Sequence, residues 1–243
     1  MPAPKYDLIY ETLRRRIATG AYPSQTLLPS ENTLVQEFSC SRNTIRRAIA
    51  ALGQQGYVQS IHGKGVRVLY NPTQKAQFSV GRIESFEESA LRNQRVPSTD
   101  VVHFEPLVAD EVVHKATGFA VGTELIYLER VRKLDGEPLI LDLNFFNADI
   151  VQGLTPEIAA QSIYQYLEQE LGVTIGSTRR VITVERCTPL DQKYIHTGDY
   201  NCMAVVTGST YTADGRLLEY TQSHHRPDQF VFFSTAQRSK LEP

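Results

Sequence analysis

The sequence predicts an α+β protein: an N-terminal winged helix-turn-helix (residues 1–70), a linker (71–77) and a C-terminal domain with an antiparallel sheet (78–238). Apolar periodicities in the first domain fit three helices and a β-hairpin, whereas the second mixes strand and helix patterns. Residues 1–70 hold nine basic and four acidic residues, a charge of +5, which leaves −7 for the rest of a chain of net charge −2. A basic N-terminal region followed by an acidic remainder favours binding of a polyanion by the N-terminal region.

Composition excludes several classes of protein. With 41% hydrophobic and 21% charged residues, the chain of 243 residues is typical of a globular protein. No apolar run reaches the roughly 20 residues of a membrane span, and no signal peptide is evident, so we expect a cytoplasmic protein. Cys40, Cys187 and Cys202 are widely spaced and odd in number. We therefore expect no disulfide scaffold, no metal site and no cofactor.

The helices of the first domain are marked by their caps. A helix over residues 5–19 places apolar residues every four positions and stops at Gly20. Ser30 is the predicted N-cap of a short helix that continues to Phe38. Ser41 is the predicted N-cap of a third helix, over about residues 42–55.

A β-hairpin follows the third helix. Residues 57–61 alternate like a strand, residues 62–65 form a glycine-rich turn, and residues 66–68 return as the partner strand. The order helix, helix, turn, helix, hairpin predicts a winged helix-turn-helix.

The start of the third helix carries donors suited to DNA. Arg42 and Arg46 lie one turn apart, and each guanidinium can bond a guanine through O6 and N7. Ser41, Thr44 and the backbone amides there suit phosphates, which fix register without reading sequence. The alternative is that these arginines only form a solvated helix face.

The hairpin tip is small enough to enter a minor groove, with Lys64 beside the DNA backbone, although His62 could also be a turn residue without a role. The predicted DNA-contacting residues are Ser30, Ser41, Arg42, Asn43, Thr44, Arg46, Arg47, His62, Gly63 and Lys64.

The second domain alternates strand and helix patterns. Strands are predicted over residues 101–105, 125–133, 138–144, 178–186, 204–212 and 217–223, with a hairpin turn at Asp214-Gly215. Helices are predicted over residues 86–93 and 159–170, the latter ended by Gly172.

Two arginines of this domain suggest an anion site. Arg130 and Arg132 are two apart on a predicted strand and so share a face, where they repel unless an anion or carboxylates balance them. Ser85, before the helix that starts near Phe86, could add its hydroxyl and helix amides to the same anion. The alternative is that the arginines pair with Glu129, Glu137 or Glu219 on a solvated sheet face.

Other side chains complete the expected ligand site. Glu219 could accept bonds from sugar hydroxyls, and Tyr164 could cover an apolar sugar face, although Tyr164 and Ser162 could equally serve only as helix packing and a cap. Of the adjacent His224 and His225, at most one can face a pocket on one side of a strand. The candidate effector-binding residues are Ser85, Phe86, Arg130, Arg132, Ser162, Tyr164, Glu219 and His225.

Residues 5–68 resemble the DNA-binding domain of the GntR family. The resemblance rests on Leu28-Pro29-Ser30-Glu31, on the run from Ser41 to Ala48, and on Gly56-Tyr57-Val58 through Gly63-Lys64-Gly65. It implies that Arg42 and Arg46 read bases and that Gly63 sits in the minor groove.

Residues 78–236 resemble the UTRA effector domain of the HutC branch, an α+β fold related to chorismate lyase. The motifs are Ser85-Phe86, residues 128–132, Gly136-Glu137-Pro138-Leu139, Ser162-Ile163-Tyr164 and residues 219–223. The resemblance implies that Arg130 and Arg132 hold the phosphate of a phosphosugar. Residues 141–171 and 219–228 are similar to the trehalose-operon repressors of this branch, which implies trehalose 6-phosphate as the inducer.

These observations predict a transcriptional repressor, without catalytic residues, that binds double-stranded operator DNA and is released by a phosphosugar. A homodimer is expected because one recognition helix reads only a half-site, with a hinge near residues 70–80. Two alternatives stay open: another effector, such as an amino sugar phosphate or an organic acid, or an enzyme built on the lyase-like fold.

Overall fold

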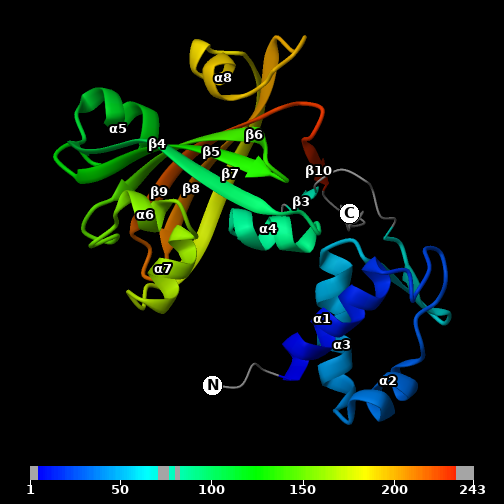
Figure 1. Cartoon of the computed structure of the whole chain (residues 1–243). Helices are drawn as coiled ribbons and strands as arrows, with labels where there is room; N and C mark the ends of the chain where they lie inside the picture. The colour runs from blue at the N-terminus through cyan, green and yellow to red at the C-terminus, as the bar shows by residue number, and fades with distance from the viewer. Residues whose placement is uncertain (1–4, 71–76, 80–82, 234–243) are drawn as a thin grey trace, which may run out of the picture. The chain divides into compact units, whose positions relative to one another are not determined.

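The computed structural model describes residues 5–70, 77–79 and 83–233 of the chain (Figure 1). The described residues divide into two compact units: residues 5–70, 78–79 and 232–233 belong to the helical unit, and residues 77 and 83–231 belong to the sheet unit. Apart from Gln77, the predicted linker (71–77) lies outside the described residues, and the expected hinge lies largely outside them. The domain boundaries at 70 and 78 therefore stay predictions.

The helical unit has the predicted order of elements, which confirms the winged helix-turn-helix. Its elements are α1 (Lys5–Ala18), α2 (Glu31–Phe38), α3 (Arg42–Gln54), β1 (Val58–Ile61) and β2 (Gly65–Val68). The side chains of Ser30 and Ser41 accept the backbone N–H groups of Thr33 and Thr44, so both predicted N-caps form. β1 and β2 pair antiparallel from Val58–Val68 to Ile61–Gly65.

One apolar core holds the helical unit together. Leu13, Leu34, Ile45 and Leu52 have no exposed surface and come from all three helices. Val68 of the hairpin joins the same core, and so the wing is fixed to the helices. This core orients α3, because its buried stripe determines which side chains of α3 point outward.

The sheet unit is built on one antiparallel sheet of six strands in the order β4-β5-β6-β9-β8-β7. The strands are β4 (Pro97–Val108), β5 (Glu124–Leu134), β6 (Glu137–Asn147), β7 (Ile175–Arg186), β8 (Cys202–Thr212) and β9 (Leu217–His225). A separate pair joins β3 (Gln77–Ser79) to β10 (Val231–Phe233). The predicted antiparallel α+β architecture is confirmed.

Helices cover both faces of the sheet (Figure 1). The face that we call the α7 face packs α4 (Phe86–Arg92), α6 (Pro156–Ala159) and α7 (Ile163–Gln169). The opposite α8 face packs α5 (Glu111–Thr117) and α8 (Pro189–Tyr194).

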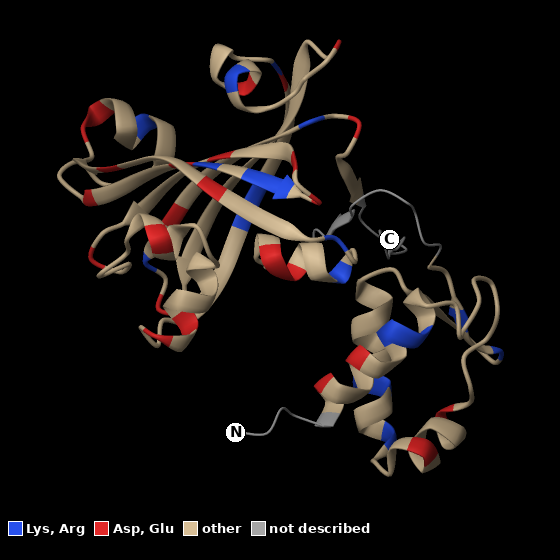
Figure 2. Cartoon of the chain, in the orientation of Figure 1, with Lys and Arg blue, Asp and Glu red and all other residues tan. Residues whose placement is uncertain are grey.

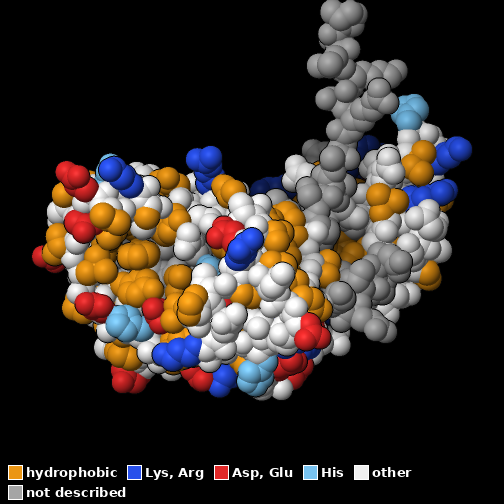
Figure 3. Space-filling model, turned by 90° about the horizontal axis from the view of Figure 1, so that it is seen from above, with side chains coloured by type: hydrophobic (Ala, Val, Ile, Leu, Met, Phe, Trp, Pro, Cys, Tyr) orange, Lys and Arg blue, Asp and Glu red, His pale blue; other side chains and the backbone are white. Residues whose placement is uncertain are grey.

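Between α5 and α8, the α8 face carries a row of half-buried aromatic rings. The ring centroids of Tyr127 and Phe145 are 4.8 Å apart, and those of Phe145 and Tyr220 are 6.3 Å apart. Hydrophobic side chains gather over this unit in Figure 3, which looks at the molecule from above the view of Figure 1.

The helix predicted over 159–170 is confirmed only from residue 163 to residue 169, and its predicted start is wrong. The chain forms α6 and α7 instead, because the Ser162 side chain accepts the backbone N–H of Gln165 and starts a new helix there. The sequence reasoning also missed α5 and α8. Their signals were an aspartate cap at Asp110 and a Thr188-Pro189 helix start.

Leu52→Ala is expected to lower the free energy of unfolding by about 2–5 kcal/mol, since it removes a fully buried side chain and leaves a cavity. Leu8→Ala on α1, where Leu8 is 64% exposed, is the matched control and should change stability by less than about 0.5 kcal/mol. Urea unfolding followed by helical circular dichroism measures both. Equal losses in the two variants would contradict the packing described here.

Candidate DNA-binding and effector sites

The predicted DNA readers lie on α3, and their side chains are on its exposed face. Figure 2 marks the positions of lysine and arginine along the ribbon of this unit. Arg42, Asn43, Arg46 and Arg47 are exposed, whereas Ile45 and its neighbours on the other side of the helix are buried. The hydroxyls of Ser41 and Thr44 lie 2.8 Å apart at the start of this helix. The structure therefore brings the predicted base and phosphate donors together at one end of α3.

Two of these arginines have partners within the helical unit. Arg46 Nε donates to both carboxylate oxygens of Glu31, at 3.1 and 3.0 Å. The Arg47 guanidinium lies 4.0 Å from the centre of the Tyr6 ring on α1. Since Arg46 is 64% exposed, its ion pair with Glu31 is weak and DNA can compete for it.

The wing tip is a three-residue loop between β1 and β2. His62, Gly63 and Lys64 are all exposed, and the Lys64 N–H donates to the Ile61 carbonyl at 3.0 Å. Gly63 has a φ of 72°, a conformation that side chains with a Cβ rarely adopt. A Cβ there would meet nothing within 4 Å, so the glycine is required by the turn and not by crowding within the chain.

In the sheet unit, Arg130 and Arg132 both lie on the α7 face and are buried, with 3% and 6% of their surface exposed. Arg132 Nε donates to Asp142 Oδ2 at 2.8 Å, and its Nη1 donates to Thr99 Oγ1 at 2.8 Å. Glu87 of α4 lies 3.7 Å from the same Nη1. Arg132 is thus balanced by two carboxylates.

Arg130 is placed differently. Its Nε donates to the neutral Asn144 Oδ1 at 3.0 Å, and its guanidinium lies 6.0 Å from the centre of the Phe146 ring. In the part of the chain that the structure describes, no carboxylate lies within 4.0 Å of the Arg130 guanidinium. Burial and the charge of Arg132 lower the pKa of Arg130 to about 10, so Arg130 remains charged at neutral pH.

A hydrogen-bonded chain leads from Arg130 to the helices. Asn144 Nδ2 donates to Glu219 Oε1 at 2.8 Å, and Tyr164 Oη donates to Glu219 Oε2 at 2.7 Å. Burial of Glu219 disfavours its charge and raises its pKa, although both of these donors oppose the shift. Both oxygens of the predicted sugar acceptor are therefore engaged by the protein.

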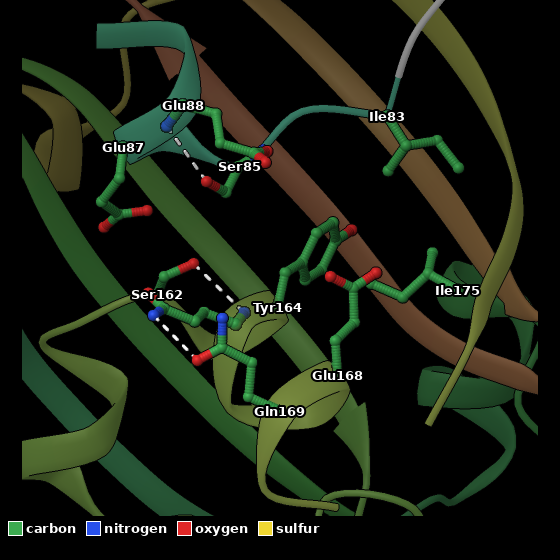
Figure 4. A pocket seen from close by; sticks show the side chains of 10 residues that line it. Ile83, Ser85, Glu87, Glu88, Ser162, Tyr164, Glu168, Gln169 and Ile175 are labelled. Carbon is green, nitrogen blue, oxygen red and sulfur yellow. Dashed lines mark hydrogen bonds between the residues drawn. The ribbon is translucent and has the colours of Figure 1, made fainter. Parts of the chain in front are cut away.

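A cavity of about 310 Å³ opens between α4 and α7 (Figure 4). It is lined by Ile83, Ser85, Glu87, Glu88, Ser162, Tyr164, Gln165, Glu168, Gln169 and Ile175. Three of the predicted site residues, Ser85, Ser162 and Tyr164, thus lie on its wall. Phe86, Arg130, Arg132, Glu219 and His225 do not line it.

Some expectations from the sequence need correction. The arginines are buried and not on a solvated face. The carboxylate that pairs with Arg132 on the sheet is Asp142, which β5–β6 pairing brings to the same face, next to Arg130. The start of α4 is already capped: the Ser85 N–H donates to Glu88 Oε2 at 2.7 Å, and the Glu88 N–H donates to Ser85 Oγ at 3.1 Å. Those donors are engaged and not free for an anion.

The two adjacent histidines face opposite ways, as the alternation of a strand predicts. His224 lies 2.9 Å from Asp191 of α8, measured from Nδ1 to Oδ1, on the α8 face. His225 is on the α7 face, with its ring 4.8 Å from that of Phe230. Burial lowers the pKa of His225 to about 4, so this ring is neutral at physiological pH.

The sequence reasoning missed Asp142, Asn144 and Glu87. A signal was present, because Leu141-Asp142-Leu143-Asn144 places two polar residues two apart on an apolar strand, the spacing of Arg130 and Arg132. Glu87 had no such signal, because its place beside Arg132 depends on how α4 packs on the sheet.

Comparisons with known proteins agree with this architecture. The model of the gntR family of bacterial regulatory proteins matches residues 5–68, and the UTRA domain model matches residues 92–231. The HTH-type transcriptional regulator TreR of Bacillus subtilis (strain 168) is 36% identical over 240 residues, 99% of this chain and 100% of TreR. The mannosyl-D-glycerate transport/metabolism system repressor MngR of Escherichia coli (strain K12) is 24% identical, over 97% of each chain.

Solved structures have the same fold. YydK from Bacillus subtilis superposes with a TM-score of 0.80 at 20% identity, covering 96% of this chain and 100% of YydK. The effector-binding domain of the trehalose repressor (TreR) of Bacillus subtilis superposes with a TM-score of 0.53 at 36% identity, covering 59% of this chain and 99% of that domain.

The sequence matches span nearly the whole chain, and the matched proteins are transcriptional regulators and not enzymes, which confirms the predicted regulatory role. The chain belongs to the GntR family of bacterial transcriptional regulators and carries a UTRA effector domain.

Proposed function

We propose that this regulator represses a sugar-utilisation operon in the cytoplasm and leaves its operator when it binds a phosphosugar, trehalose 6-phosphate. The observation that carries the proposal is Arg130, a buried and charged guanidinium without a carboxylate partner among the described residues. A buried cation is costly unless an anion balances it, and a phosphate matches the planar guanidinium fork well.

The DNA-binding role rests on α3 and the wing. Arg42 and Arg46 would bond base edges in the major groove, Ser30, Ser41, Asn43, Thr44 and Arg47 would contact the backbone, and the tip from His62 to Lys64 would enter the minor groove. Each α3 reads one half-site, so the regulator would act as a homodimer on a two-fold symmetric operator.

Glu87 suggests how the effector enters. It lines the cavity and lies 3.7 Å from Arg132, so it occupies a place that an incoming phosphate would take. The phosphate would displace Glu87 and form ion pairs with Arg132 and Arg130. Because Glu87 lies on α4, its displacement would shift this helix. In sequence, α4 is the first helix after the segment that leads from the helical unit.

Similarity to a known regulator supports trehalose as the sugar part of the effector. The relative at 36% identity is described as the trehalose repressor, and its effector domain has the fold of the sheet unit. Tyr164, whose ring borders the cavity, and Glu219 behind it supply an apolar surface and an acceptor for a sugar. An amino sugar phosphate or an organic acid is the second candidate, because the same arginines would accept either anion.

The release mechanism is one of linkage. A ligand weakens DNA binding only as far as it prefers the form of the protein that does not bind DNA. The effector must therefore bind the free regulator more tightly than the operator complex.

Arg42→Ala is expected to weaken operator binding by about 1–3 kcal/mol and to relax base preference at one position of each half-site. Lys64→Ala should weaken binding to operator and to unrelated DNA alike, with a shallower dependence on salt. Fluorescence anisotropy with operator and single-base variants, at several salt concentrations, compares the two. The assignment of Arg42 fails if its variant keeps full base preference.

Arg130→Gln should leave operator affinity unchanged but raise the trehalose 6-phosphate concentration needed for release about ten- to hundredfold, because a charged hydrogen bond is lost. Arg130→Lys, which keeps the charge, should fall between this variant and the wild type. Lys115→Gln, at an exposed position on α5, is the control.

The readout is operator release over a panel of trehalose 6-phosphate, glucosamine 6-phosphate, citrate and unphosphorylated trehalose, with circular dichroism to verify folding. Release of folded Arg130→Gln at the wild-type concentration would contradict the site. If only glucosamine 6-phosphate or only citrate causes release, trehalose 6-phosphate is not the effector, but the role as an effector-released regulator stands.

A further inference from the structure

Gly208 lies in the interior of β8, an inner strand of the six-stranded sheet. It has no positive φ, and its pairing with Thr221 of β9 and Arg180 of β7 runs without a register shift at this point. Neither a turn nor a bulge therefore requires a glycine here. A glycine inside a strand weakens it, and in such a place it often marks the close approach of a ligand.

Gly208 is on the α7 face, between the parts of the sheet that α4 and α7 contact. The hydroxyl of Tyr164 on α7 lies 3.3 Å from that of Thr210, the next residue of β8 on the same face. α4 packs against Arg132, which strand pairing aligns with Ala204, two same-face positions from Gly208 on the other side. The cavity opens between the same two helices.

The missing side chain leaves room above β8. In the described part of the chain, a Cβ at Gly208 would have two atoms within 4 Å, Thr221 Cγ2 at 3.1 Å and Thr178 Oγ1 at 3.9 Å. Both atoms belong to neighbouring strands of the sheet, and neither belongs to a helix that covers it. A ligand that lies on the sheet can therefore approach the backbone closely at this position.

The side chains around Gly208 on this face carry hydroxyl and amide groups. Thr210 Oγ1 donates to Thr178 Oγ1 at 3.1 Å on one side. On the other side, Asn144 Nδ2 donates to Thr221 Oγ1 at 2.8 Å. Threonine hydroxyls and asparagine amides both donate and accept hydrogen bonds, as the hydroxyl groups of a sugar ring do. The surroundings of Gly208 thus suit a neutral sugar ring.

Arg130 and Gly208 lie within reach of one extended ligand. Arg130 bonds Asn144 on β6, and β8 is two strands from β6, about 10 Å away. A phosphate at Arg130 with one sugar ring would extend over β9, and a second ring would extend over Gly208 toward Arg180 on β7. Burial raises the pKa of Tyr164 and the charge of Arg180 opposes this rise, so Arg180 acts on the same side of the sheet as the cavity wall.

We propose that Gly208 determines the specificity of the effector site for two sugar rings: its missing side chain admits the second ring of a disaccharide phosphate, which Thr178 and Arg180 bond through its hydroxyls. This inference rests on the proposed function and specifies how the same site distinguishes a disaccharide phosphate from a monosaccharide phosphate. Crowding by a single added methyl group is enough to exclude a closely packed ring.

Crowding against Thr221 is the alternative reason for a glycine at this position. A Cβ 3.1 Å from the Thr221 methyl group would press on it and disturb its bond from Asn144. Thr221→Ser removes this methyl group and keeps the hydroxyl. Gly208→Ala is therefore introduced together with Thr221→Ser, and Thr221→Ser alone is the reference.

Calorimetry on the full-length proteins compares trehalose 6-phosphate with glucose 6-phosphate, which lacks the second ring. Relative to Thr221→Ser, we expect Gly208→Ala/Thr221→Ser to bind trehalose 6-phosphate about tenfold more weakly and glucose 6-phosphate equally well, because the added methyl group takes the place of the second ring. Equal affinity of the two proteins for trehalose 6-phosphate, or an equal loss for both ligands, overturns the inference.

Arg180→Gln gives an independent readout. It removes a charged donor to the second ring and should weaken binding of trehalose 6-phosphate about tenfold, without a change for glucose 6-phosphate. Arg179→Gln is the matched control, because Arg179 is exposed and points to the opposite face of the same strand. Equal affinities of the two variants for trehalose 6-phosphate contradict the placement of the second ring.

The wild-type protein separates this inference from the proposed function. If it binds neither phosphosugar, the proposed effector is wrong and the inference fails with it. If trehalose 6-phosphate releases it from the operator, but Gly208→Ala/Thr221→Ser responds at the same concentration as Thr221→Ser, only the role of Gly208 is refuted and the proposed function stands.

Discussion

The sheet unit is organised around two positive charges buried side by side on one face of its sheet. Arg130 and Arg132 are nearly inaccessible, and each guanidinium needs partners that water no longer supplies. Asp142 and Thr99 serve Arg132, and Asn144 serves Arg130. Because these partners come from β4 and β6, the pairing of three strands must be correct before both guanidinium groups have these partners.

Burying charged arginines in the protein core costs free energy. Replacing a buried ion pair by apolar side chains is often neutral or stabilising, so stability alone does not explain two arginines in this core. The opposite face of the same sheet is closed by apolar contacts, such as Val131 and Leu141 against Ile195. The α7 face carries the two arginines beside an apolar cluster, and a cavity opens between its helices α4 and α7.

Much of this organisation could be predicted from local patterns. The caps at Ser30 and Ser41, the hairpin and the shared face of Arg130 and Arg132 each depend on residues close in sequence. What could not be predicted depends on register or packing: Asp142 as the partner of Arg132, Glu87 in front of it, and the Arg46–Glu31 pair. The break between α6 and α7 at Ser162 was not predicted, because apolar residues continue at helical spacing on both sides of it.

The account depends most on Arg130 awaiting an anion, and calorimetry with the wild-type protein tests this directly. Titrations with trehalose 6-phosphate and with trehalose measure the contribution of the phosphate group to the binding affinity, since the two ligands share the sugar. The account predicts that trehalose 6-phosphate binds about a hundredfold more tightly, as expected for charged hydrogen bonds to a buried guanidinium. Equal affinity for the two ligands would contradict it.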